Sequence, residues 1–183
     1  MTRMQKLAAF ILLALLQLGV VFYMVWHWED VAQNGRVVHL AVKPVDPYDL
    51  LRGRYIDLNF GELKVATDVP FENGEKVYAI FEEENERVKI TAVSRTRPDN
   101  QEYVNAKVSY YNANAKTVQV MVPFKRYYMP EELAPLAEKL YNRRAINDGV
   151  ARLRVKNGDA VIEEIYFGDK TIYEHLKDGA VEK

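Results

Sequence analysis

Residues 151–167 read ARLRVKNGDAVIEEIYF, and their pattern predicts an antiparallel β-hairpin. Two β-rich runs, residues 151–156 and 160–167, flank the pair Asn157 and Gly158. Asn and Gly tolerate the positive φ angles that a type I′ turn requires, so this pair fits the two central turn positions. We therefore expect this part of the chain to fold as paired antiparallel strands.

The sequence upstream of this hairpin predicts more of the same architecture. Further β-rich runs cover residues 37–42, 55–60, 76–83, 87–94, 103–111 and 117–122. Short polar connections separate the last four runs into two hairpins. Residues 130–144 instead place Leu133, Leu136, Ala137, Leu140 and Tyr141 at helical spacing, with Pro135 expected in the first turn. The predicted fold class is mainly β with one amphipathic helix (α+β), the helix packed on an antiparallel sheet.

An apolar run, LAAFILLALLQLGVVFYMVW (residues 7–26), precedes all of these strands. About 20 helical residues span about 30 Å, which is the hydrocarbon thickness of a bilayer. Tyr23, Trp26 and Trp28 stand at its far end, where aromatic rings favour the headgroup layer. The run is long for a cleaved signal peptide, and bulky residues follow its centre, so we favour a retained anchor over cleavage or a buried core helix.

The charges around the run predict its orientation. Arg3 and Lys6 precede it, and Glu29 and Asp30 follow it. By the positive-inside rule, residues 1–6 are cytoplasmic, residues 7–28 form a single span in the cell membrane, and residues 29–183 are extracytoplasmic. The exported part has the size of one domain or of two small lobes, the second from about residue 124 to residue 183.

Composition narrows the possible partners and chemistry. Without Arg3 and Lys6, 23 basic side chains face 26 acidic ones, a balance that gives no argument for nucleic acid or for an anionic membrane surface. The chain has no cysteine, which excludes disulfides, thiolate metal sites and cysteine nucleophiles. No glycine-rich phosphate loop is present either, so we expect no cofactor.

The segment PVDPYDLLRGRYIDLNF (residues 44–60) is more specific than an ordinary loop. A structural interpretation has the acids and Gly53 making turns and Tyr55 and Leu58 in a strand. A functional interpretation has the acids and arginines forming a polar cleft, with Arg52 offering a planar donor fork to a carboxylate or phosphate. The candidate binding residues are Asp46, Asp49, Arg52, Gly53, Arg54, Tyr55 and Leu58.

This segment resembles the signature of the GDYXXLXY family, a group of bacterial proteins that typically carry an N-terminal membrane span and have no assigned activity. Gly53, Tyr55 and Leu58 match the motif, whereas Arg54 stands where the family has Asp and Phe60 where it has Tyr. The resemblance extends to residues 127–131 and to the hairpin around Asn157 and Gly158. It implies a membrane-anchored protein and names no reaction.

Other candidate chemistry is sparse. The three histidines, His27, His39 and His175, lack metal-binding spacing, and the glutamates of residues 82–86 lack the alternating oxygen ligands of a Ca²⁺ loop, so no metal site is expected. Ser94 and Ser109 lack a nucleophile elbow, although a serine–lysine pair with Lys107 or Lys125 stays open. No catalytic residue is therefore assigned.

The leading functional hypothesis is a single-pass membrane protein, leaning away from an enzyme, whose exported β-rich domain binds a partner. We expect that partner to be another membrane or envelope protein. The alternative is a membrane-tethered extracytoplasmic hydrolase or small-ligand-binding protein that uses residues 46–55.

Overall fold

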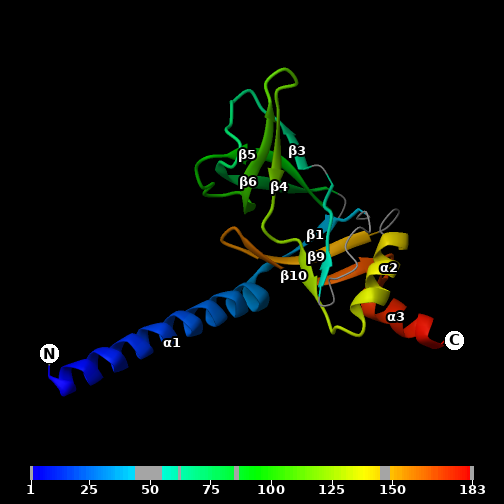
Figure 1. Cartoon of the computed structure of the whole chain (residues 1–183). Coiled ribbons are helices and arrows are strands. Elements are labelled where there is room, and N and C mark those ends of the chain that lie inside the picture. Colours follow the sequence, from blue (N-terminus) through cyan, green and yellow to red (C-terminus); the bar gives the residue numbers. More distant parts are fainter. Residues whose placement is uncertain (1, 44–54, 62, 85–86, 145–148, 182–183) are drawn as a thin grey trace.

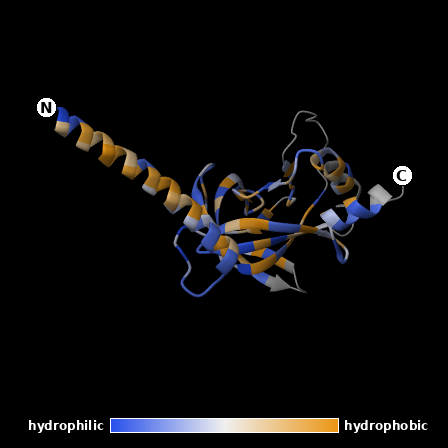
Figure 2. Cartoon of the chain, turned by 90° about the horizontal axis from the view of Figure 1, so that it is seen from below, coloured by the Kyte–Doolittle hydropathy of each residue, from blue (hydrophilic) through white to orange (hydrophobic). Residues whose placement is uncertain are grey.

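The computed structural model describes residues 2–43, 55–61, 63–84, 87–144 and 149–181. Helix α1 (Arg3–Asn34) projects away from the rest of the molecule (Figure 1). Hydrophobic residues predominate along most of its length (Figure 2), and its most apolar stretch is not buried against the domain. Within the described part of the chain, α1 is the one helix that is long and apolar enough to cross a membrane.

Five strands form a nearly closed antiparallel barrel, the upper part of the domain in Figure 1. Their order in the sheet is β3-β7-β6-β4-β5, and β3 and β5 approach each other across the remaining gap. The strands are β3 (Leu63–Ala66), β4 (Lys76–Glu84), β5 (Arg87–Ser94), β6 (Tyr103–Asn112) and β7 (Thr117–Met121). The two hairpins predicted upstream, β4–β5 and β6–β7, are therefore confirmed.

A second antiparallel sheet has the order β1-β9-β10-β11. Its strands are β1 (Arg36–Ala41), β9 (Gly149–Lys156), β10 (Asp159–Phe167) and β11 (Lys170–Thr171). The predicted β9–β10 hairpin is confirmed, with φ angles of 52° at Asn157 and 85° at Gly158. Strand β1 pairs with β9, so this sheet joins the two ends of the chain.

The remaining elements lie beside the second sheet, with the two helices on the side away from α1 (Figure 1). They are the paired strands β2 (Tyr55–Asp57) and β8 (Arg126–Tyr128), and the helices α2 (Ala134–Arg144) and α3 (Ile172–Val181). Pro135 lies in the first turn of α2, as predicted, and Ala137 and Tyr141 are buried. Leu136, which the helical spacing placed in the apolar stripe, is instead exposed.

The tip of the β9–β10 hairpin joins the two sheets. The Asn105 amide in β6 donates to the Gly158 carbonyl oxygen at 2.7 Å. A Cβ atom on Gly158 would lie 2.6 Å from the Tyr103 ring, so only glycine permits this approach with a positive φ. One hydrophobic cluster then continues from the barrel through the second sheet to Ile172 in α3. The antiparallel β-rich fold class is confirmed.

Candidate functional site

The structure describes two of the seven candidate binding residues, Tyr55 and Leu58. The other five, Asp46, Asp49, Arg52, Gly53 and Arg54, lie outside the described residues, so the cleft proposed for them stays a prediction. Leu58 is buried in the core, as is Ile56, whereas Tyr55 is only half-buried. Burial therefore alternates along this strand, and Tyr55 and Leu58 lie on opposite faces.

Tyr141 of α2 holds the two chain segments that flank residues 44–58. Its hydroxyl donates to the Lys43 carbonyl oxygen at 2.6 Å and accepts from the Asn59 amide at 3.1 Å. Lys43 and Asn59 also form a β-bridge, in which the Lys43 amide donates to the Asn59 carbonyl oxygen at 2.6 Å. Burial raises the pKa of the Tyr141 hydroxyl to about 12. The ends of the motif segment are thus fixed by a neutral, buried phenol.

Strand β8 places a second tyrosine beside the motif. Tyr55 and Tyr128 are opposite residues in the β2–β8 pair, with ring centroids 5.7 Å apart. The Arg126 guanidinium lies over the Tyr55 ring, 4.7 Å from its centroid, and its Nε is 3.9 Å from Asp57 Oδ1. We call Tyr55, Arg126 and Tyr128 the tyrosine surface. Tyr128 is 65% exposed, so its ring is available for contact.

The middle residue of β8, Tyr127, points the other way and anchors the strand. It is buried, and its hydroxyl donates to Glu164 Oε1 in β10 at 2.8 Å. Burial, followed by this hydrogen bond to Glu164, raises the pKa of the Tyr127 hydroxyl above its usual range. The tyrosine surface therefore sits on a strand that is tied to the second sheet.

The end of α1 contacts β9 and β10 directly. His27 Nε2 lies 3.0 Å from Asp159 Oδ2, and Lys156 Nζ lies 2.7 Å from both carboxylate oxygens of Asp30. Val31 is 1% exposed, so the last turns of the helix contribute to the core. No local sequence pattern predicts this docking, because the partners lie more than 120 residues apart along the chain.

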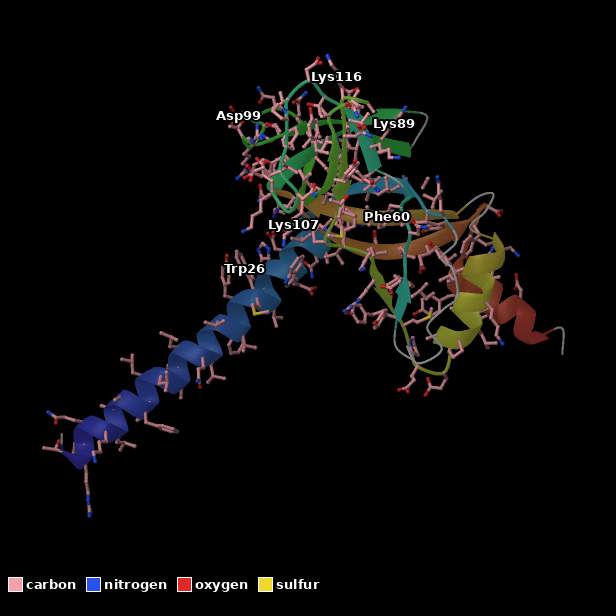
Figure 3. The ribbon with its side chains drawn as sticks, turned by 45° about the horizontal axis from the view of Figure 1, so that its top comes forward. Trp26, Phe60, Lys89, Asp99, Lys107 and Lys116 are labelled. Atoms are coloured by element: carbon pink, nitrogen blue, oxygen red, sulfur yellow. The ribbon has the colours of Figure 1, made fainter. Side chains whose placement is uncertain are left out.

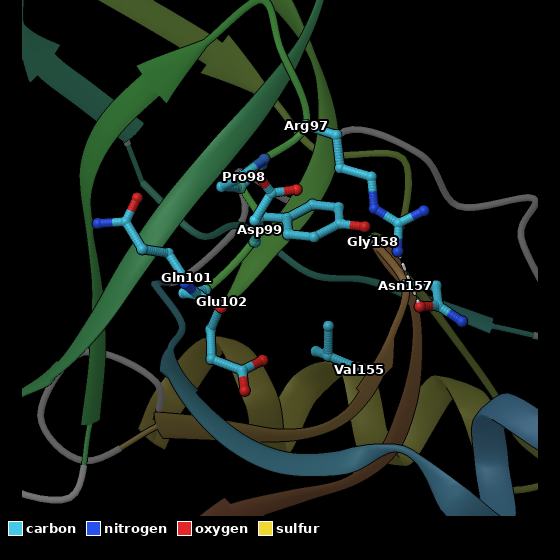
Figure 4. Close-up of a pocket in the computed structure, with 10 residues that line it drawn as sticks. Arg97, Pro98, Asp99, Gln101, Glu102, Val155, Asn157 and Gly158 are labelled. Atoms are coloured by element: carbon cyan, nitrogen blue, oxygen red, sulfur yellow. Dashed lines mark hydrogen bonds between the residues drawn. The ribbon is translucent and has the colours of Figure 1, made fainter.

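A polar pocket of about 620 Å³ opens between the β5–β6 connection and the hairpin tip (Figure 4). Arg97 Nη2 donates to Asn157 Oδ1 at 3.1 Å across it, and the Arg97 guanidinium lies 5.6 Å from the Tyr103 ring centroid. Glu102 pairs with Arg36 at 2.9 Å. Arg97 and Glu102 are thus each paired, whereas the buried Tyr103 hydroxyl has no hydrogen-bond partner among the described residues. The described lining residues include no serine, threonine or histidine.

The other candidate groups have structural partners. The Ser94 hydroxyl donates to the Thr96 carbonyl oxygen at 2.7 Å, and the Ser109 hydroxyl donates to the Gln119 carbonyl oxygen at 3.1 Å. His175 lies 3.1 Å from the Phe167 carbonyl oxygen. Within the described ranges, no group of three or more His, Asp or Glu residues is placed to hold a metal ion.

These features define a class of protein: a small antiparallel β domain that begins directly where an apolar helix ends. The sequence model described as GDYXXLXY protein matches residues 17–165, from within α1 to β10, and the chain belongs to this family. The function of the family is unknown. Comparison with curated proteins and with solved structures found no match.

Proposed function

We propose that this chain is a single-pass membrane protein, with its N-terminus in the cytoplasm, whose extracytoplasmic domain (residues 29–183) binds another membrane or envelope protein. The observation that supports binding is the tyrosine surface. Tyrosine and arginine are the residues most enriched at the energetic centres of protein interfaces, since they provide large contact areas together with hydrogen-bonding groups. Here Arg126 and Tyr128 are exposed beside the half-buried Tyr55 of the family motif.

The build of the tyrosine surface supports a docking role for it. Strands β2 and β8 form a two-stranded sheet, and Tyr127 and Ile56 bury the opposite face. The buried face fixes the position of the exposed face, so binding a partner would cost little conformational entropy. The last turns of α1 support membrane anchorage, because they dock onto the domain rather than ending in a loose connection.

Orientation can be tested with single cysteines, because the native chain has none. Thr2→Cys and Lys116→Cys place a thiol before α1 and on the far end of the barrel, respectively. A membrane-impermeant maleimide should label Lys116→Cys in intact cells and Thr2→Cys only after lysis. The reverse pattern would contradict the proposed orientation, and release of the Lys116→Cys variant from the membrane would indicate a cleaved signal.

Partner binding can be tested by photocrosslinking in membranes. A photoreactive residue replacing Tyr128 should give a discrete adduct, and the same residue replacing Tyr110, a 53% exposed tyrosine on the barrel, should not. Arg126→Ala should abolish the Tyr128 adduct while leaving thermal unfolding of the purified chain nearly unchanged. Equal crosslinking from both positions, or no effect of Arg126→Ala, would contradict a specific interface.

A further inference from the structure

A groove of about 640 Å³ on the outer face of the barrel collects positive charge. Its charged lining residues are Lys76, Arg95, Lys107 and Lys125, and none of the described residues that line it is acidic. We call it the lysine groove. This concentration is unexpected in a chain whose formal net charge is −1.

Three of these cations have no ion-pair partner among the described residues. Arg95 pairs with Glu75 and also donates to the Pro70 carbonyl oxygen at 2.7 Å, so its charge is balanced. Within the described part of the chain, none of the ion pairs involves Lys76, Lys107 or Lys125. Lys76 and Lys107 are directly opposite each other in the β4–β6 register, where like charges destabilise the sheet. An anion between them would relieve that repulsion.

The groove also offers apolar contact area beside the lysines. Met121 is the register partner of Lys107 in the β6–β7 pair and is 54% exposed. Val122 and Pro123 continue the lining from there. A ligand that combines an anionic group with apolar chains therefore matches the lining better than a simple anion does.

The groove lies close to the C-terminal end of the apolar run in α1, where the helix meets the domain. His27, which follows Trp26, contacts Asp159 at 3.0 Å, and Asp159 Oδ1 accepts from Asn105 Nδ2 at 3.1 Å. Asn105 lines the groove, and Lys107 is two residues further along β6, about 7 Å away. Figure 3 shows Lys107 beside the point where α1 reaches the domain, whereas Lys89 and Lys116 lie towards the other end of the barrel. Lysine side chains at such positions reach the headgroup layer with their ammonium groups.

We propose that the lysine groove binds the phosphate headgroup of an anionic phospholipid from the bilayer that α1 crosses. Lys76 and Lys107 contact the phosphate oxygens, Lys125 adds to the positive field, and the surface around Met121 contacts the first part of an acyl chain. This inference depends on α1 being a membrane span and is independent of the tyrosine surface.

The test uses the full chain in nanodiscs of phosphatidylcholine mixed with phosphatidylglycerol. After gentle extraction, native mass spectrometry counts the phosphatidylglycerol that stays bound to the wild type, to Lys76→Gln/Lys107→Gln and to the control Lys89→Gln/Lys116→Gln. We expect the groove variant to lose phosphatidylglycerol several-fold, and the control, which removes the same charge, to match the wild type. Equal retention by all three proteins would overturn the lipid site alone.

Two further arms separate the alternatives. Failure of the wild type to enter nanodiscs would overturn the membrane span and the lipid site together. The second arm measures the rate at which Lys76 and Lys107 react with an amine reagent. Adding inorganic phosphate to phosphatidylcholine nanodiscs should leave this rate unchanged, whereas including phosphatidylglycerol in the nanodiscs should lower it. Equal protection by inorganic phosphate would overturn the assignment to a lipid and indicate a simple anion site.

Discussion

The Tyr141 hydroxyl lies 2.6 Å from the carbonyl oxygen of Lys43, a residue 98 positions earlier in the chain. The same hydroxyl accepts from the Asn59 amide, so one phenol in α2 closes the base of the motif segment. The contact joins the motif to the helix through a buried group rather than through the surface.

Tyr141→Phe should therefore destabilise the domain. The substitution keeps the ring and leaves the Lys43 carbonyl and the Asn59 amide without this partner, which costs about 1–3 kcal/mol. Urea unfolding of the detergent-solubilised chain measures the change, with Tyr110→Phe as an exposed control expected to stay within about 0.5 kcal/mol of the wild type. Equal stability of the two variants would show that the hydroxyl contributes nothing.

The raised pKa of Tyr141 predicts that the stability difference between the wild type and Tyr141→Phe depends on pH. The folded-state pKa of about 12 exceeds the unfolded value of about 10, so the stabilising effect is complete below about pH 10 and is lost as the pH rises through about 12. The stability gap between the wild type and Tyr141→Phe should shrink over this window. Unfolding curves collected across it provide the check, and a gap that stays constant would contradict the shift.

Gly35→Ala should disturb the junction between α1 and the second sheet. A Cβ atom there would collide with the Val31 carbonyl oxygen and lie 3.0 Å from Arg154 Cβ. We expect the free energy of unfolding to fall by about 1–3 kcal/mol, as at other overpacked sites, and amide hydrogen exchange to be faster in the last turns of α1. Gly19→Ala is the matched control, because a Cβ at Gly19 meets no atom within 4 Å.

Gly158→Ala and Gly168→Ala separate backbone strain from crowding. Both glycines have positive φ, 85° and 66°, but only a Cβ on Gly158 would enter the Tyr103 ring. Gly168→Ala should lower the free energy of unfolding by about 1–2 kcal/mol, because alanine disfavours a positive φ. Gly158→Ala should lower it clearly more, because the clash with Tyr103 adds to that strain. Thermal unfolding of both variants tests this, and equal losses would mean that the hairpin tip moves aside without cost.

The elements predicted from the sequence were those whose signals are local. The type I′ hairpin follows from Asn157 and Gly158 themselves, and α2 follows from apolar spacing. The short strands β3 and β8 contain too few residues to show an alternating pattern. Their pairing partners are also determined by the tertiary fold and not by local sequence. Helix α3 had a signal that was missed: Thr171 and Glu174 form a capping box, with the Glu174 carboxylate accepting from the Thr171 amide at 2.7 Å.

The candidate surfaces were harder to predict than the fold. The motif itself identifies Tyr55, but its neighbours Arg126 and Tyr128 come from a strand some 70 residues later. The lysine groove depends on the register that sets Lys76 opposite Lys107, and no pattern within either strand reveals it. Overall charge balance gives no argument for an anionic membrane surface, because the net charge averages over a distribution that the fold makes uneven.

Helix α1 ends at Asn34, and strand β1 begins at Arg36, so Gly35 alone separates a membrane-sized helix from a strand paired along its whole length with β9. A linker of one residue leaves the helix and the domain little freedom to move independently. Any mechanical load that a bound partner exerts on the domain would pass through β9 and β1 into α1 as tilt or torque. If α1 spans a bilayer as proposed, the domain and the helix would therefore move as one lever, with the domain as the arm and α1 as the shaft.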